Sequence, residues 1–288
     1  MKSMKNILLL TDFSDNALHA VEYAIRYFEE KEVTFHLLHV KDMRGFVSDD
    51  LIGASTGTDV YETIIGGIKK ELKKVQEYLE GKYNSPGHTF KTKTVYSPFF
   101  DAVRDYSKKE KIDMIVMGTK GATGAKQVFV GSTTSKIINR MDVPVLAIPE
   151  DYDFQPIKKV LFPLDFKVDF LPITLLPLLE LLDRYQPNLK IVYLDETQKE
   201  LTDEQKLNRE ETERIFKGYH FSLHTVRGLD LDSALSCLSE FLQTQMIVMI
   251  KKERSFVQRV FKGTHIRKVS YHIKVPLLVL PESKVLQD

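Results

Sequence analysis

The sequence predicts an α/β fold built from two similar domains, each a five-stranded parallel sheet with helices on both faces. Three observations predict it: apolar runs alternate with amphipathic segments, a polar stretch interrupts them midway, and the pattern then repeats. A length of 288 residues suits two domains of ordinary size. We place them at residues 1–150 and 151–288.

The strands of the first half are short runs rich in Ile, Val and Leu. We expect them at residues 6–11, 33–40, 88–95, 113–118 and 143–149. Runs of this kind, separated by helices, are typical of parallel strands buried on both faces. The expected order across the sheet is 3-2-1-4-5, a doubly wound, Rossmann-like arrangement.

Helical periodicity fills the intervals between these strands. In the first interval apolar residues recur every three or four positions from Leu18 to Phe28, and Ser14 or Asp15 can cap that helix. Gly81 suits the end of a second helix. Further helices are expected at residues 97–111 and 132–140, the last capped by Ser132.

Residues 149–158 contain two prolines and mostly polar side chains, which indicates a linker. After it the order of strands and helices restarts. Shifted by about 132 positions, residues 114–150 align with residues 246–282 without a gap, and roughly 14 of 37 positions are identical. We therefore expect two copies of one fold.

Glycines concentrate at one point of the first copy. Four of the chain's 14 glycines lie between residues 118 and 131, directly after the fourth strand. A glycine at a strand end lets another group approach the backbone closely. Gly131 and Ser132 place backbone N–H groups at a helix N-terminus, where the helix dipole favours an anion. This segment therefore predicts a phosphate-binding loop.

The expected strand order supplies the rest of the crevice. In a doubly wound sheet, ligands bind beyond the carboxyl ends of the strands where the strand order reverses. Thr11 and Asp12 end the first strand, Val40 ends the second and Gly118 ends the fourth. Neither a Walker A loop nor a G-x-G-x-x-G motif is present.

The spacing Gly-x2-Gly-x9-Gly-Ser, read at Gly118, Gly121, Gly131 and Ser132, resembles that of nucleotide-binding members of the universal stress protein family. The segments "ILLLTDFS", "LLHV", "DMIVMG" and "VPVLAIP" extend the resemblance, which covers nearly the whole chain as a tandem of two such domains. One departure is Leu10, where many members have a proline.

The resemblance implies ATP or AMP in this crevice, with any Mg²⁺ held by the phosphates and water. Asp12 and Val40, with Thr11 beside them, would lie near adenosine. The residues expected around ribose and phosphates are Gly118, Lys120, Gly121, Gly131, Ser132 and Thr133. We expect no catalytic residue and no protein-held metal, so the protein would be a binding protein with at most weak ATPase activity.

The second copy keeps the fold and loses this pocket. Ile250 and Glu253 replace the first two glycines, so a branched side chain and a carboxylate stand where a phosphate would bind. Gly263 and Thr264 keep the helix start. We therefore expect one nucleotide per chain, bound by the first half, in a regulatory or protective stress-response role.

Two alternatives remain open: a slow ATP hydrolase or nucleotidyl-transferring enzyme in the same crevice, and a nucleotide-free scaffold. The fifth strand is expected to pair the two domains, and a homodimer is open. The 41 basic and 40 acidic residues nearly cancel, so nucleic acid is an unlikely partner, although residues 251–268 hold seven basic residues. With no signal peptide, no membrane-spanning segment and a lone Cys237, expected in the core, we expect a cytoplasmic protein without a membrane partner.

Overall fold

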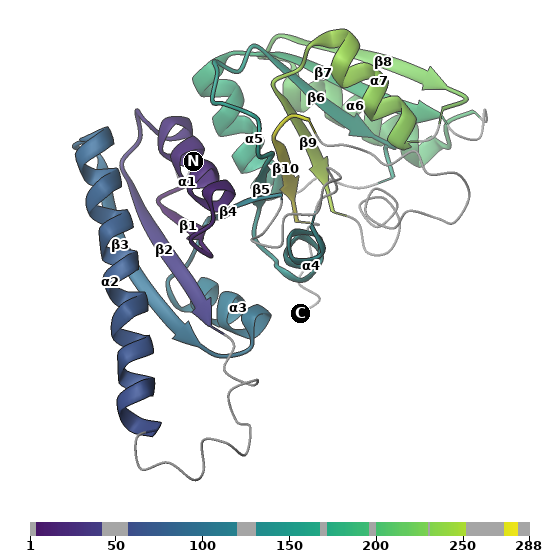
Figure 1. The fold of residues 1–288 in the computed structure, drawn as a ribbon. Helices are drawn as coiled ribbons and strands as arrows, with labels where there is room; N and C mark the ends of the chain where they lie inside the picture. Colours follow the sequence, from purple (N-terminus) through teal and green to yellow (C-terminus); the bar gives the residue numbers. More distant parts are fainter. Residues whose placement is uncertain are drawn as a thin grey trace.

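The computed structural model describes residues 4–41, 57–119, 131–167, 172–195, 200–229, 231–251 and 274–281. Their strands form one ten-stranded sheet in the order β3-β2-β1-β4-β5-β10-β9-β6-β7-β8. Figure 1 shows this sheet running through both halves of the chain. The α/β class and the 3-2-1-4-5 order predicted from the sequence are confirmed in each half.

In the first half, the strands are β1 (Asn6–Leu10), β2 (Val33–Lys41), β3 (His88–Tyr96), β4 (Met114–Gly118) and β5 (Val145–Ile148). The helices between them are α1 (Asp15–Tyr27), α2 (Gly57–Tyr83), α3 (Phe99–Lys109) and α4 (Ser132–Arg140). All strand pairs within this half are parallel.

In the second half, the strands are β6 (Lys159–Leu164), β7 (Asn188–Asp195), β8 (Phe221–Arg227), β9 (Met246–Ile250) and β10 (Leu277–Leu280). The helices are α5 (Pro172–Tyr185), α6 (Asp203–Phe216) and α7 (Leu231–Leu242). Their strands too pair in parallel.

β5 and β10 form the antiparallel pair of the sheet, where the two halves meet (Figure 1). Leu146 pairs with Leu278, which lies 132 positions later and is its own counterpart in the repeat. Val145 pairs with Val279 and Ala147 with Leu277. This strand pair is thus self-complementary, as in an isologous interface between identical subunits.

The hydrophobic core lies on both faces of the sheet. In the central strands of the sheet, almost every residue is buried. On β1, Ile7 and Leu9 join the cluster beneath α1, α2, α5 and α6, whereas Leu8 and Leu10 join the cluster beneath α3, α4 and α7. Each cluster extends through both halves. This explains the near-continuous apolar runs of the strands.

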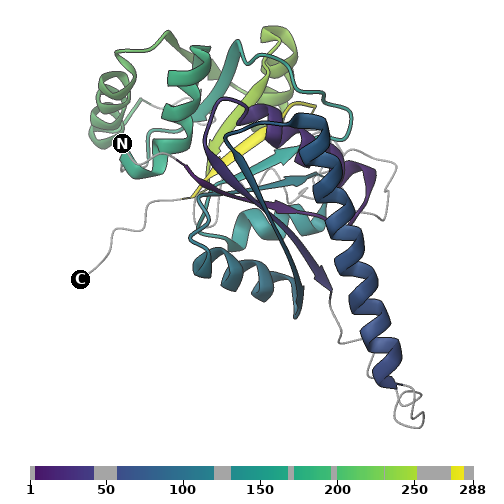
Figure 2. The same ribbon diagram turned by 90° about the vertical axis from the view of Figure 1, so that its left-hand side faces the viewer.

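Two helix details differ from the sequence prediction. α2 continues past Gly81 to Tyr83, and Asn84 takes the positive φ of 32° that follows the helix. Asparagine tolerates this conformation better than most residues do, so it can end a helix in place of glycine. The start of α2 extends beyond the sheet (Figure 2). Cys237, expected in the core, is exposed on α7.

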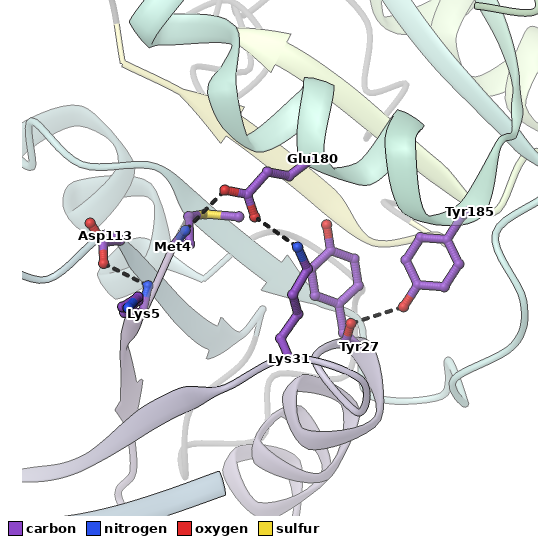
Figure 3. A network of polar contacts seen from close by, with 7 residues as sticks. All are labelled: Met4, Lys5, Tyr27, Lys31, Asp113, Glu180 and Tyr185. Atoms are coloured by element: carbon purple, nitrogen blue, oxygen red, sulfur yellow. Dashed lines mark hydrogen bonds and ion pairs between the residues drawn. The ribbon is translucent and has the colours of Figure 1, made fainter. Parts of the chain in front are cut away.

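Side chains from α5 join the two halves above the sheet. Glu180 accepts a hydrogen bond from the Met4 amide at 2.9 Å and lies 3.9 Å from the Lys31 ammonium (Figure 3). The Tyr185 hydroxyl donates to the Tyr27 carbonyl at 2.9 Å (Figure 3). No helix in the described part of the chain has the length and apolarity needed to cross a bilayer.

Candidate functional site

The carboxyl end of β1 is a tight corner built by Thr11. Its amide donates to the Leu38 carbonyl at 3.1 Å, which extends the β1–β2 ladder by one residue. Its hydroxyl oxygen accepts from the Phe13 amide at 3.1 Å, which turns the chain away from the sheet. Thr11 is buried in this corner.

Asp12 organises the start of α1. Its Oδ1 atom accepts hydrogen bonds from the Ser14 amide at 3.1 Å and the Ser14 hydroxyl at 2.5 Å. Ser14 in turn caps α1, because its Oγ atom accepts from the Ala17 amide at 3.2 Å. In the second half, Asp165 makes the same turn by accepting from the Lys167 amide at 3.1 Å. Asp12 therefore has a structural role that both halves need.

His39, which the sequence analysis missed, supports this corner from β2. Its Nδ1 atom lies 2.9 Å from the Thr11 carbonyl oxygen, so Nδ1 carries the proton and donates. Its ring stacks on Phe13, with centroids 4.5 Å apart, and Phe13 has a φ of 64°. Burial lowers the pKa of His39. The one feature of the sequence that could have pointed to His39 is that it is a polar residue within an apolar strand.

Gly118 ends β4, the strand next to β1. A Cβ atom there would lie 2.5 Å from Asn16 Nδ2 and 2.9 Å from Asn16 Cγ, so the Asn16 side chain of α1 occupies the space beside this glycine. In the β1–β4 pair, Leu9 lies opposite Val116. Continued by two residues, it places Thr11 across from Gly118.

The two ends of the glycine loop, Thr119 and Gly131, lie next to each other at the end of β4. The Thr119 amide donates to the Ile148 carbonyl at 2.9 Å, and the Gly131 amide donates to the Thr119 carbonyl at 2.6 Å. The Thr134 hydroxyl donates to the Gly118 carbonyl at 3.0 Å. These bonds bring Gly118 and Gly131 together, although Lys120 and Gly121 lie outside the described residues.

Helix α4 begins at this junction. Its N-cap is Gly131, not Ser132 as predicted, so no side chain caps its first-turn amides. That turn contains no acidic residue, whereas α1 and α6 have both a side-chain cap and acidic residues there. Ser132 and Thr133 are exposed. Amides left without intrahelical acceptors at a helix start favour an anion.

Val40 lies on the strand next to β1. It is half-buried, pairs with Val95 and packs against the cluster beneath α3 and α4. It therefore presents an apolar wall near the same edge of the sheet as Thr11. Within the described residues, no group of three or more His, Cys, Asp or Glu side chains could hold a metal ion.

The corresponding corner of the second half is filled. Ile250 stands at the end of β9, where the first half has Gly118, and it is 5% exposed. Glu253, Gly263 and Thr264 lie outside the described residues.

This fold and this site define a class: a doubly wound α/β protein with a glycine loop and a helix start at the switch point of its first half. The model of the universal stress protein family matches residues 4–149, about half of the chain. The chain belongs to the universal stress protein family.

Individual proteins show the same relationship. The chain is 30% identical over 148 residues to the universal stress protein MJ0531 of Methanocaldococcus jannaschii, which covers 50% of this chain and 81% of that protein. It is 26% identical over 152 residues to MJ0577 of the same organism, covering 50% and 94%. A universal stress protein structure from Archaeoglobus fulgidus superimposes with a TM-score of 0.70 over 96% of this chain and 98% of that chain, at 18% identity. That likeness extends the family fold to the second half.

Proposed function

We propose that the first half binds an adenine nucleotide, ATP or AMP, and that the protein is a cytoplasmic stress-response protein with a regulatory or protective role. One observation carries most of the argument. The hydrogen bond between the Gly131 amide and the Thr119 carbonyl holds the uncapped start of α4 beside the end of β4. Both segments belong to the glycine spacing that is characteristic of nucleotide-binding members.

The roles of the residues follow from their places. Thr11, Asp12 and Val40 would border adenosine, and the Asp12 turn would fix the loop rather than activate water. Gly118, Gly131, Ser132 and Thr133 would surround ribose and phosphates, with Lys120 and Gly121 completing the loop. The uncapped amides fit a phosphate, and a Mg²⁺ ion would be held by phosphate oxygens and water.

The structure of the second half is an argument for one nucleotide site per chain. The buried side chain of Ile250 stands at the position of Gly118, where the first half has no side chain and Asn16 packs against the backbone. We infer that the second domain, residues 151–288, stabilises the first, residues 1–150, through the β5–β10 pair.

Binding can be tested by thermal unfolding with ATP and with AMP. A ligand at 100 times its dissociation constant adds about 2.7 kcal/mol to the free energy of unfolding. The most informative variant is Gly131→Asp. The φ of −55° at Gly131 accepts any residue, and Asp is a preferred N-cap, so the helix should remain while a carboxylate competes with phosphate.

The matched control is Gly131→Asn, which caps the helix without charge. We expect the Asp variant to lose more ATP affinity than the Asn variant, with neither less stable than wild type without ligand. No stabilisation of the wild type by either nucleotide would contradict the proposal and favour a scaffold. Steady turnover of Mg-ATP that an Asp12→Asn variant abolishes would favour the enzyme.

A further inference from the structure

Lys251 directly follows Ile250, the last residue of β9, at the corner where the second half differs from the first. Its amide donates to the Leu280 carbonyl at 2.8 Å, just as the Thr119 amide donates to the Ile148 carbonyl at 2.9 Å. The two residues are therefore equivalent in backbone position. They differ in reach, because Thr119 is buried beside its own strand and lysine has a four-carbon chain.

The Lys251 side chain crosses to the first half. Its Nζ atom donates to the Met141 carbonyl at 2.8 Å and lies 3.4 Å from the Asn139 carbonyl. Both carbonyls lie at the C-terminal end of α4, where the last carbonyls lack intrahelical donors. A cation at this end also interacts favourably with the helix dipole.

Helix α4 connects this contact to the proposed phosphate site. It is nine residues long, its buried face contains Thr134, Ile137 and Ile138, and its N-cap is tied to Thr119. Closely packed interiors transmit strain, so we expect the two ends of a short helix packed in this way to shift together. A contact that fixes its C-terminal end therefore also fixes the direction of its first-turn amides.

We propose that Lys251 is a positioning residue through which the second half holds α4 and thereby sets the phosphate affinity of the first half. This inference rests on the proposed function of the Gly118–Gly131 site. It gives this corner of the second half a role. The residue after the first glycine of the loop is Thr119 in the first half, and its counterpart Lys251 binds the neighbouring half. Because coupling between sites is reciprocal, a bound phosphate should in turn stabilise the contact between the halves.

The test uses the full chain with Lys251→Met, and Lys251→Arg as the conservative variant. The matched control is Lys274→Met, which removes a lysine that pairs with Glu240 inside the second half. Affinities for ATP, AMP and adenosine are measured by calorimetry. We expect Lys251→Met to weaken ATP and AMP about two- to fivefold, in line with charge effects at helix ends, and to leave adenosine unchanged. Lys251→Arg should restore most of the affinity, and Lys274→Met should match wild type.

A second measurement needs no ligand. Hydrogen exchange of the free protein should be faster in Lys251→Met throughout α4, including its first turn next to Gly131. Faster exchange confined to the last turn, or an equal loss of affinity for ATP and adenosine, would overturn the inference alone. If wild type binds neither ATP nor AMP, the proposed function and the inference both fail.

Discussion

At the scale of single residues, comparing the two halves at the carboxyl end of β1 distinguishes residues that stabilise the fold from residues that could bind a ligand. Asp12 and Asp165 make the same turn, and Phe13 and Phe166 both take a positive φ and stack on a ring of the next strand. Features present in both halves cannot explain a site in one. Gly118 differs, because its counterpart is Ile250.

Gly118 can be tested through its neighbour Asn16. Gly118→Ala should lower the free energy of unfolding by about 1–3 kcal/mol, because the new Cβ would overlap the Asn16 side chain. Adding Asn16→Ala should recover part of this loss, since the crowded atoms are then absent. Urea unfolding of the two single variants and the double variant gives the coupling energy. Strictly additive effects would show that the crowding is relieved elsewhere.

At the scale of elements, the important feature is the β5–β10 pair. Each strand would be an open, fully apolar sheet edge if its half stood alone, and such edges tend to pair. In this chain each covers the other, so a homodimer would have to use another surface. The outer strands of the described sheet, β3 and β8, are more exposed, and β3 has Lys91 and Lys93.

The pairing predicts the behaviour of residues 1–150 produced alone. We expect this half to dimerise through β5, because Leu146 can pair with Leu146 of a second copy as it pairs with Leu278 here. Analytical ultracentrifugation would measure its mass. Addition of residues 151–288 should replace the dimer by a one-to-one complex. A fragment 1–150 that is folded and strictly monomeric would contradict both the edge argument and this domain boundary.

At the scale of the whole molecule, the halves are also joined by polar groups that are largely removed from water. The Glu180 side chain is 12% exposed and lies between the Met4 amide and Lys31 (Figure 3). Burial raises the pKa of this carboxyl group, while the Met4 amide and Lys31 oppose that rise. The ionised form of Glu180 is therefore less favourable in this interface than it is in water.

This predicts a pH dependence that a Glu180→Gln variant can isolate. Because the folded-state pKa lies above the unfolded one, the native state binds the proton more tightly. Wild-type stability should therefore rise relative to the Gln variant as pH falls through the folded pKa of Glu180. Melting temperatures of both proteins at pH 7.5 and pH 5 give the difference. A difference that does not change with pH would contradict the raised pKa.

The strands, the helices, their order along the chain and the repeat could all be predicted from the amino-acid sequence, because periodicity and β-propensity depend on neighbouring residues alone. It also placed Thr11, Val40 and Gly118 at one edge of the sheet, since the order of parallel strands requires this. The filled corner at Ile250 followed from aligning the two copies.

The contacts between residues far apart in the chain could not be predicted in this way and are seen in the folded protein. These include Asn16 against Gly118, His39 beneath Thr11, Glu180 between the halves and Lys251 on the end of α4. The N-cap of α4 also shifted to Gly131, since the bond to Thr119 fixes where that helix begins. Such contacts depend on how the helices lie across the sheet, and no local pattern of residues encodes that.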